Sequence, residues 1–252
     1  MNTFDKIIFD VDSTLVTIEG LDELANLKGK RQEVTELTRL SMDGKVRLEE
    51  VFALKMAMIR PSKKDLEFLG QLYLQNITDD IVEIISLLRK LKKEVLQVTG
   101  NFYPAVKILA KHLKIPLKNV YSNKIYFNKY GEYVGFDARG PLSISGGKKV
   151  IINKIINNKP QNKIVFIGDG STDMETKPPV KLFIGYGGII KRPNVLSHSD
   201  IYISSRSLSP ILRFILNKDE QEIGRTLCNK LFRKADKLIE SNYVVIKNKS
   251  YE

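Results

Sequence analysis

Residues 6–15 have the sequence KIIFDVDSTL, and the interpretation of the fold begins with them. The apolar run Ile7–Phe9 predicts a buried strand. Asp10 and Asp12 follow this run two residues apart, and such residues point to the same side of an extended chain. At about 3.3 Å per residue their carboxylates would lie roughly 6–7 Å apart, so that one could attack an atom while the other transfers a proton. Taken alone, the two aspartates equally fit a strand that ends in a solvated acidic turn.

The composition is that of an ordinary soluble domain. The chain has 252 residues, 42% of them apolar and 28% charged, which suffices for one sizeable domain or a core with a smaller module. It has no apolar run of about 18 residues, as a membrane span would require, and no secretory signal pattern. The single cysteine, Cys228, excludes an internal disulfide. We therefore expect a cytoplasmic protein without a membrane partner.

The net charge of +12 favours anionic partners. The lysines are scattered among acidic residues, and no basic stripe is interleaved with aromatic residues that could stack on bases. We therefore expect no nucleic-acid partner, whereas weak attraction of small phosphate esters fits this charge. His112 and His198 are isolated in the sequence and indicate no zinc site.

Strand patterns alternate with helix patterns over most of the chain. Residues 16–78 show only helical spacing of apolar residues, which predicts a helical insert. Strands are expected at 93–99, 163–167, 180–184 and 201–203, a short turn and strand at 115–121, and an aromatic hairpin around 128–131. This alternation predicts an α/β fold with a doubly wound, Rossmann-like, largely parallel sheet. The predicted parts are an α/β core (1–15 and 79–216), the helical insert (16–78) and a C-terminal helical extension (217–252).

Polar residues follow three of the predicted strands, and functional residues of parallel sheets gather at the carboxyl ends of strands. Carboxylates that converge there repel one another unless a cation joins them, and Mg²⁺ prefers such oxygen ligands. Lys148 and hydroxyl or amide donors suit a phosphate group. A carboxylate nucleophile with a second acid could then hydrolyse a phosphate ester. The residues at the three strand ends are Asp10 with Asp12, Thr99 with Gly100, and Asp169 with Asp173.

These residues resemble the four motifs of the haloacid dehalogenase superfamily. The motifs are DVDST at 10–14, Thr99-Gly100, Lys148, and GDGSTD at 168–173. Within the superfamily the sequence is most similar to the phosphoserine phosphatase family, from about residue 5 to about residue 214. The resemblance implies a helical cap, formed by residues 16–78 between the first and second motifs, that closes over the site and excludes water.

The resemblance also implies a role for each site residue. Asp10 would be the nucleophile and Asp12 the acid and base. The Mg²⁺ ligands would be Asp10, the backbone carbonyl of Asp12, and Asp169, supported by Asp173. Phosphate would be held by Thr99, the Gly100 amide and Lys148, which is preferred over Lys149 because it directly follows a glycine pair. The substrate, expected to be L-phosphoserine, would contact Glu19, Met42, Lys55, Asn101, Thr172 and Arg192.

Four positions depart from the family pattern. Thr99 replaces a serine, and Asn101 and Asp43 replace glycines. Lys55 takes the place of an arginine that grips the substrate carboxylate, and lysine keeps the charge without the bidentate fork. Another small phosphomonoester is therefore an alternative substrate, and a non-catalytic binding protein is a third hypothesis.

Several residues also have an alternative, purely structural interpretation. Glu19 could cap the first helix of the insert, Lys55 and Arg192 could be solvated surface residues, and Asp173 could be a charge at a helix N-terminus. In the tail, apolar residues recur at helical spacing, which predicts an amphipathic helix packed on the core. A homodimer contact and an anionic surface anchor are the alternatives. The apolar tail positions are Ile223, Leu227, Leu231, Ala235 and Leu238.

Overall fold

The stretch at residues 6–15 forms the central strand and the turn that follows it. The computed structural model describes residues 4–42, 47–156 and 163–251, but not the side chains of 39–42 and 48. β1 (Lys6–Phe9) pairs in parallel with β2 (Glu94–Phe102) on one side and with β6 (Ile164–Gly168) on the other. Ile7, Ile8 and Phe9 are fully buried because β1 lies in the middle of the sheet.

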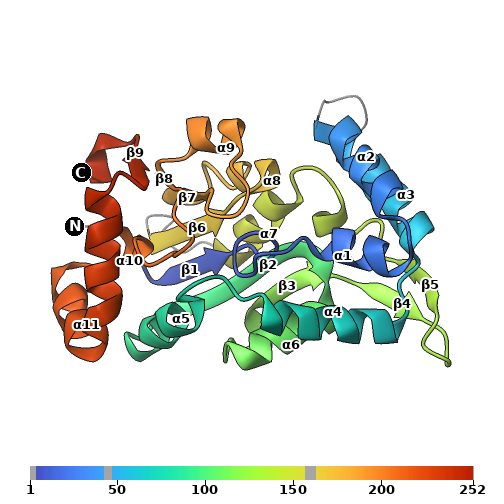
Figure 1. Ribbon diagram of the computed structural model, residues 1–252, viewed down its shortest axis with the longest axis horizontal. Coiled ribbons are helices and arrows are strands. Elements are labelled where there is room, and N and C mark those ends of the chain that lie inside the picture. Colours follow the sequence, from blue (N-terminus) through green and yellow to red (C-terminus); the bar gives the residue numbers. More distant parts are fainter. Residues whose placement is uncertain (1–3, 43–46, 157–162, 252) are drawn as a thin grey trace.

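The sheet has seven strands in the order β3-β2-β1-β6-β7-β8-β9 (Figure 1). All neighbouring pairs are parallel except the last, in which β9 runs antiparallel to β8. The α/β fold predicted from the sequence is confirmed. The remaining strands are β3 (Val120–Asn123), β7 (Leu182–Tyr186), β8 (Ile201–Ile203) and β9 (Val244–Ile246).

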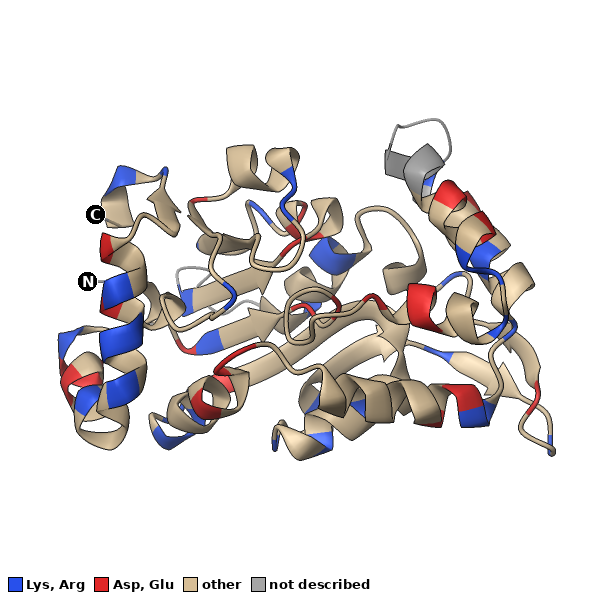
Figure 2. Cartoon of the chain, in the orientation of Figure 1, with Lys and Arg blue, Asp and Glu red and all other residues tan. Residues whose placement is uncertain are grey.

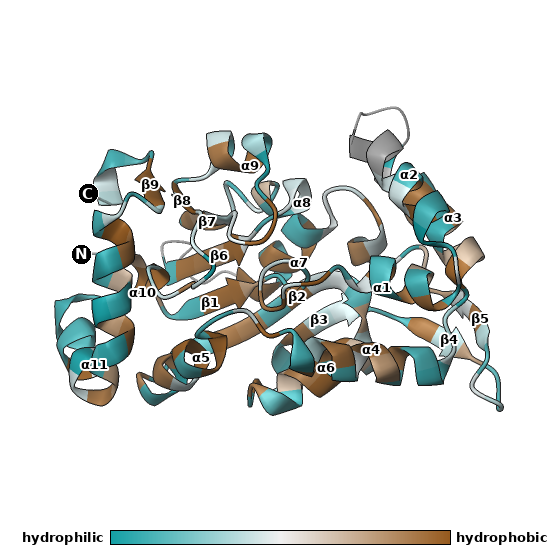
Figure 3. Ribbon diagram, in the orientation of Figure 1, coloured by the Kyte–Doolittle hydropathy of each residue, from teal (hydrophilic) through white to brown (hydrophobic). Residues whose placement is uncertain are grey.

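The strands in the middle of the sheet consist largely of hydrophobic residues, which Figure 3 colours brown, and their buried side chains belong to two core clusters. Along β1 the side chains alternate, so Ile7 and Phe9 join one core cluster and Ile8 joins the other. The larger cluster includes residues of α5 (Ile81–Lys90), α6 (Tyr103–His112) and α10 (Ile211–Ile215). The smaller one includes residues of α7 (Gly147–Ile156) and α9 (Pro193–His198).

In the described part of the chain, four helices lie between β1 and α5, where the apolar periodicity of residues 16–78 predicts helices. A bridge between Val16 and Ile77 joins the two ends of this insert. On α3, Phe52 packs against Phe102 of β2 and Phe136 of the predicted hairpin, with ring centroids 5.9 and 5.3 Å away. These aromatic contacts fix the insert against the core. The insert comprises α1 (Gly20–Leu27), α2 (Arg31–Met42), α3 (Leu48–Ile59) and α4 (Lys63–Gln75), and the hairpin comprises β4 (Ile125–Phe127) and β5 (Tyr133–Phe136).

The C-terminal extension differs from its prediction in two ways. It contains α11 (Lys218–Glu240), but the chain then returns as β9 to the edge of the sheet, so the extension is not wholly helical. The predicted apolar face is also wrong over its first half, where Ile223 and Leu227 are 52% and 48% exposed. The backbone of Cys228 is not helical, so a face predicted from helical spacing does not continue across this position. Among the described residues, no helix is both apolar and long enough to cross a membrane.

Charged residues of both signs are interspersed along α11 and the neighbouring elements (Figure 2). One pair is largely buried. Lys93, just before β2, pairs with Glu220 of α11, and the two side chains are 4% and 18% exposed. The second carboxylate oxygen of Glu220 accepts a hydrogen bond from the Asn217 backbone N–H at the start of α11. The pair therefore joins the extension to the core.

We predict that Glu220→Gln lowers the free energy of unfolding by about 3 kcal/mol, because it leaves the buried Lys93 ammonium without a counter-charge. Glutamine can still accept the Asn217 hydrogen bond, so the helix cap is retained. The matched control is Glu50→Gln, which removes an exposed partner of Arg47 and should cost less than about 1 kcal/mol in urea unfolding. Equal losses for both variants would contradict this account of the extension.

Candidate active site

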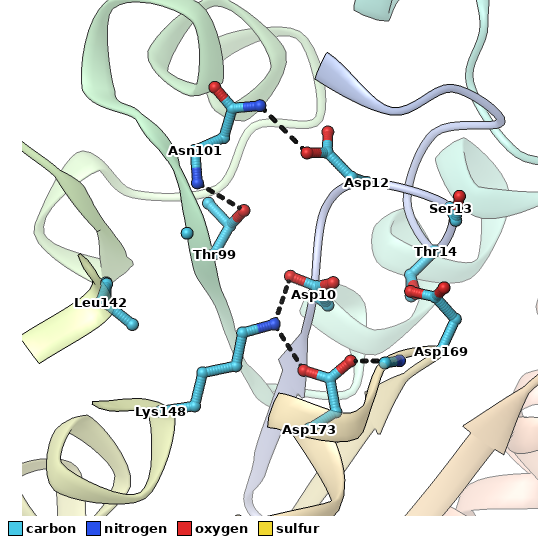
Figure 4. A network of polar contacts seen from close by, with 12 residues as sticks. Asp10, Asp12, Ser13, Thr14, Thr99, Asn101, Leu142, Lys148, Asp169 and Asp173 are labelled. Atoms are coloured by element: carbon cyan, nitrogen blue, oxygen red, sulfur yellow. Dashed lines mark hydrogen bonds and ion pairs between the residues drawn. The ribbon is translucent and has the colours of Figure 1, made fainter. Parts of the chain in front are cut away.

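Asp10, Thr99 and Asp169 lie toward the carboxyl ends of β1, β2 and β6, where the parallel strands share one edge (Figure 4). Asp10 directly follows β1, and its backbone N–H donates to the Ile167 carbonyl at 2.9 Å. The strand ends at Phe9, however, and Ser13 adopts a left-handed φ of 50°. Asp12 is therefore placed by a turn and not, as the sequence suggests, by the alternation of an extended strand.

β2 continues past Thr99 to Phe102, beyond its predicted end. Its pairing with β3 shifts register between Val98 and Phe102, and this irregularity contains Thr99 and Gly100. The Gly100 carbonyl accepts a hydrogen bond from the Asn123 side-chain amide at 2.8 Å. The irregular segment is thus anchored to β3 while it lines the site.

A cavity of about 200 Å³ lies at this edge of the sheet. It is lined by residues of the core together with Glu19, Leu21 and Phe52 of the insert, so both parts of the chain form its wall. The predicted residues that line it are Asp10, Asp12, Glu19, Thr99, Gly100, Asn101, Lys148, Asp169, Thr172 and Arg192.

Asp10, Asp169 and Asp173 form a cluster of buried acids. One carboxylate oxygen from each lies within 4.8 Å of the others, a spacing at which the three could hold one metal ion. Burial, opposed by Lys148 and reinforced by Asp10, raises the pKa of Asp173 to about 7. Burial, followed by Glu19 and Asp10, also raises the pKa of Asp169 well above its ordinary value. Because buried like charges repel, the cluster suits a divalent cation with oxygen ligands.

Lys148 supplies positive charge beside this cluster. Its Nζ lies 2.8 Å from Asp10 Oδ1 and also donates to Asp173 Oδ1. Burial lowers the pKa of Lys148, but the attraction of Asp10 and Asp173 outweighs burial and raises it above its ordinary value. Only glycine fits at position 147, directly before Lys148, because a Cβ there would lie 1.6 Å from the Pro141 carbonyl oxygen. This close approach is what brings the start of α7 to the site.

Glu19 and Arg192 join the insert to the core across the cavity. Glu19 accepts a hydrogen bond of 2.6 Å from the Ser13 hydroxyl, and its Oε1 lies 3.6 Å from Arg192 Nη2. Arg192 Nε donates to Asp169 Oδ2 at 3.1 Å. Glu19 occupies the N-cap position of α1, but its side chain makes no capping hydrogen bond. The Glu19 side chain therefore does not cap the helix, and Arg192 is paired with two acids and is not a free surface charge.

One predicted substrate residue with a described side chain, Lys55, does not line the cavity. Lys55 lies on α3, half-buried, and burial lowers its pKa, although the charges of Asp22 and Glu19 act in the opposite direction. The substrate role of Lys55 stays a prediction. Met42 ends α2, but its side chain lies outside the described part of the chain, as does Asp43.

Tyr73 is a site residue that the sequence pattern does not reveal. Its hydroxyl donates to Asp12 Oδ1 at 2.7 Å. In the sequence it continues the apolar face of α4, after Leu66 and Leu69, and so it is typical of a core position. The helical spacing of Tyr73 from Leu66 and Leu69 does not indicate that its hydroxyl group faces an acid.

Comparison with known proteins agrees with this arrangement. The model of the haloacid dehalogenase-like hydrolase family matches residues 4–176. Phosphoserine phosphatases of Bos taurus and Homo sapiens are each 38% identical to the chain over 200 residues, which cover 79% of this chain and 89% of theirs. A solved structure described as a phospho-aspartyl intermediate analogue of phosphoserine phosphatase superimposes with a TM-score of 0.74 at 26% identity, covering 85% of this chain and 100% of that one.

The chain therefore belongs to the haloacid dehalogenase-like hydrolase family. Together with the phosphatase relatives, this membership makes it a phosphoric monoester hydrolase.

We predict that the protein binds Mg²⁺ more tightly at pH 8 than at pH 6. The Asp173 carboxyl group, whose pKa is raised to about 7, keeps its proton below pH 7, and the metal must displace that proton. One displaced proton corresponds to a roughly tenfold loss of apparent affinity per pH unit below 7. Calorimetric titration with MgCl₂ measures this, with Asp169→Asn as the control that should lose binding at both pH values. Affinity that does not change between pH 6 and pH 8 would be incompatible with the raised pKa.

Proposed function

We propose that the protein is a Mg²⁺-dependent phosphatase that hydrolyses O-phospho-L-serine to L-serine and phosphate through an aspartyl phosphate on Asp10. The observation that carries this proposal is the position of Asp10, which lies at the end of β1 within reach of Lys148 and of the acid cluster. The choice of ester is supported by the relatives named phosphoserine phosphatase, which are 38% identical to the chain over 200 residues.

The phosphate end of the substrate would be held by groups of the core. The Thr99 hydroxyl, the Gly100 N–H and the Lys148 ammonium are donors that line the same cavity as Asp10. Donors of this kind offset the negative charge of the three phosphoryl oxygens. Bound between Asp10 and Asp169, with Asp173 in support and the Asp12 carbonyl as a further ligand, Mg²⁺ would supply additional charge stabilisation.

Two proton transfers by Asp12 would complete the reaction. In the first step Asp10 forms a bond to phosphorus, the ester bond breaks, and the leaving serine oxygen takes a proton from Asp12. In the second step Asp12 removes a proton from water, the water oxygen bonds to phosphorus, and the Asp10 carboxylate is released. Burial, followed by the charge of Glu19, raises the pKa of Asp12 to about 7, although Asn101 and Tyr73 lower it. A group with this pKa can act as both acid and base near neutral pH.

The serine part of the substrate would face the insert. Glu19 is the acid suited to the ammonium group, and Lys55 is the base suited to the carboxylate. Thr172, Asn101 and Met42 would complete the pocket, and Arg192 would hold Glu19 in place. The small cavity, of about 200 Å³, favours a small ester over a phosphorylated protein.

A different small phosphomonoester is the second candidate, and Lys55 is the residue that favours it. A lysine cannot grip a carboxylate with the two parallel hydrogen bonds of an arginine. If O-phospho-L-serine is the substrate, the protein would act in serine biosynthesis, in the cytoplasm. That the protein forms a homodimer stays a prediction.

We predict that the protein releases phosphate from O-phospho-L-serine in the presence of Mg²⁺ with a higher kcat/KM than from other small phosphate esters. Chelation of the metal should abolish turnover, and Asp10→Asn should lower kcat by at least about a thousandfold, because the nucleophile is removed. A colorimetric phosphate assay over a panel of esters measures all three. A better rate on another ester would favour the second candidate, and no release from any ester would refute the phosphatase.

We also predict that Lys55→Met raises KM for O-phospho-L-serine about tenfold or more, because an ion pair with the substrate carboxylate is lost. Phosphoethanolamine carries the same ammonium and phosphate groups without a carboxylate, so its KM should hardly change. Lys55→Arg is the matched variant and should retain or improve the affinity for O-phospho-L-serine. If Lys55→Met weakens both substrates equally, Lys55 does not contact the carboxylate.

A further inference from the structure

Both carboxylate oxygens of Asp12 are held by side chains from other elements. Tyr73 of α4 donates its hydroxyl hydrogen to Oδ1 at 2.7 Å, and Asn101 of β2 donates from Nδ2 to Oδ2 at 3.0 Å. Asn101 Nδ2 also donates to the Tyr73 hydroxyl oxygen at 2.7 Å. The three side chains therefore form a closed ring of hydrogen bonds, of which Figure 4 shows the Asn101–Asp12 bond.

The directions of these hydrogen bonds are fixed by a fourth contact. Asn101 Oδ1 accepts from the Phe102 backbone N–H at 2.8 Å, and a backbone N–H can only donate. The two hydrogens of Nδ2 thus remain for Asp12 and Tyr73, and the tyrosine hydrogen remains for Asp12. Each donor hydrogen has its own acceptor, so the ring is fully satisfied.

The ring is enclosed by its neighbours. Tyr73 and Asn101 are 0% and 2% exposed. A Cβ on Gly20 would lie 2.1 Å from Asn101 Nδ2 and 2.2 Å from the Tyr73 hydroxyl oxygen, so the first residue of α1 packs directly on the pair. This packing leaves no room for either side chain to move toward the start of α1. The orientation of the Asp12 carboxylate is therefore set jointly by the core and the insert.

We propose that Tyr73 and Asn101 are positioning residues for Asp12, which they hold with its carboxylate turned toward the leaving oxygen of the substrate. The inference rests on the proposed function; it adds Tyr73 to it and gives Asn101, already a pocket residue, a further role that acts through Asp12. With both oxygens held by hydrogen bonds, rotation of the carboxylate about its bond to Cβ is restricted, and proton transfer proceeds from one geometry. The contribution is largest for an ester whose leaving group needs a proton.

The test compares two esters whose leaving groups differ in this need. A serine alkoxide leaves poorly without a proton, whereas p-nitrophenolate leaves as a stable anion. For Tyr73→Phe and for Asn101→Ala we expect the ratio of kcat/KM for O-phospho-L-serine to kcat/KM for p-nitrophenyl phosphate to fall about tenfold, a fraction of the total effect of a general acid. Because kcat/KM reports phosphoryl transfer to Asp10, the later hydrolysis step does not enter this ratio.

A double-mutant cycle shows whether the effect passes through Asp12. In an Asp12→Asn background the ratio should no longer respond to Tyr73→Phe, because the positioned acid is already lost. Tyr130→Phe, at a tyrosine that is 75% exposed on the hairpin, should leave the ratio of the wild-type protein unchanged.

Three results would overturn the inference. If Tyr73→Phe and Asn101→Ala lower both kcat/KM values in parallel, the two residues have only a structural role. If the ratio still falls in the Asp12→Asn background, they act on another group. If the wild-type protein hydrolyses neither ester, the proposed function itself fails, and that result is distinct from the first two because it appears before any substitution.

Discussion

The site depends on how buried negative charge is balanced at one edge of the sheet. The small cavity is lined by four acids, Asp10, Asp12, Glu19 and Asp169, and a fifth acid, Asp173, lies beside it. Among the described residues, its lining contains two bases, Lys148 and Arg192. The acids exceed the bases, so burial and mutual repulsion raise the pKa values of Asp12, Asp169 and Asp173. Such a cavity is a place where a divalent cation lowers the free energy, and this imbalance accounts for the metal that we propose.

The parallel sheet explains why the acids meet although they are far apart in the sequence. Strands β1, β2 and β6 are adjacent, and each delivers residues to the same edge. The insert contributes what the core lacks, namely Glu19 beside Arg192 and Tyr73 beside Asp12. In the proposed function the core would hold the phosphoryl group, while the insert would complete the pocket and, through Tyr73, help to position Asp12.

Much of this arrangement could be predicted from the sequence, because it follows from short-range patterns. Apolar runs followed by Asp10 and Asp169 predict strand ends, and parallel strands bring those ends together. Features that depend on backbone irregularity could not be predicted. Asp12 lies in a turn, Thr99 lies within an irregular part of β2, and α11 is kinked at Cys228, next to the exposed Leu227. Periodicity assumes a regular backbone and fails at such positions. The contact between Tyr73 and Asn101 could not be predicted either, because it joins two elements whose relative placement is not encoded in any local sequence pattern.

The central claim is that Asp10 is phosphorylated beside a bound divalent cation. The most direct measurement is a crystal structure of the protein with MgCl₂ and beryllium fluoride, which mimics a phosphoryl group on a carboxylate. We predict that the beryllium bonds to an Asp10 carboxylate oxygen and that Mg²⁺ lies between Asp10 and Asp169, with fluorides near Thr99 and Lys148. A structure in which the Asp10 side chain is bare while the mimic occupies another position would contradict the account.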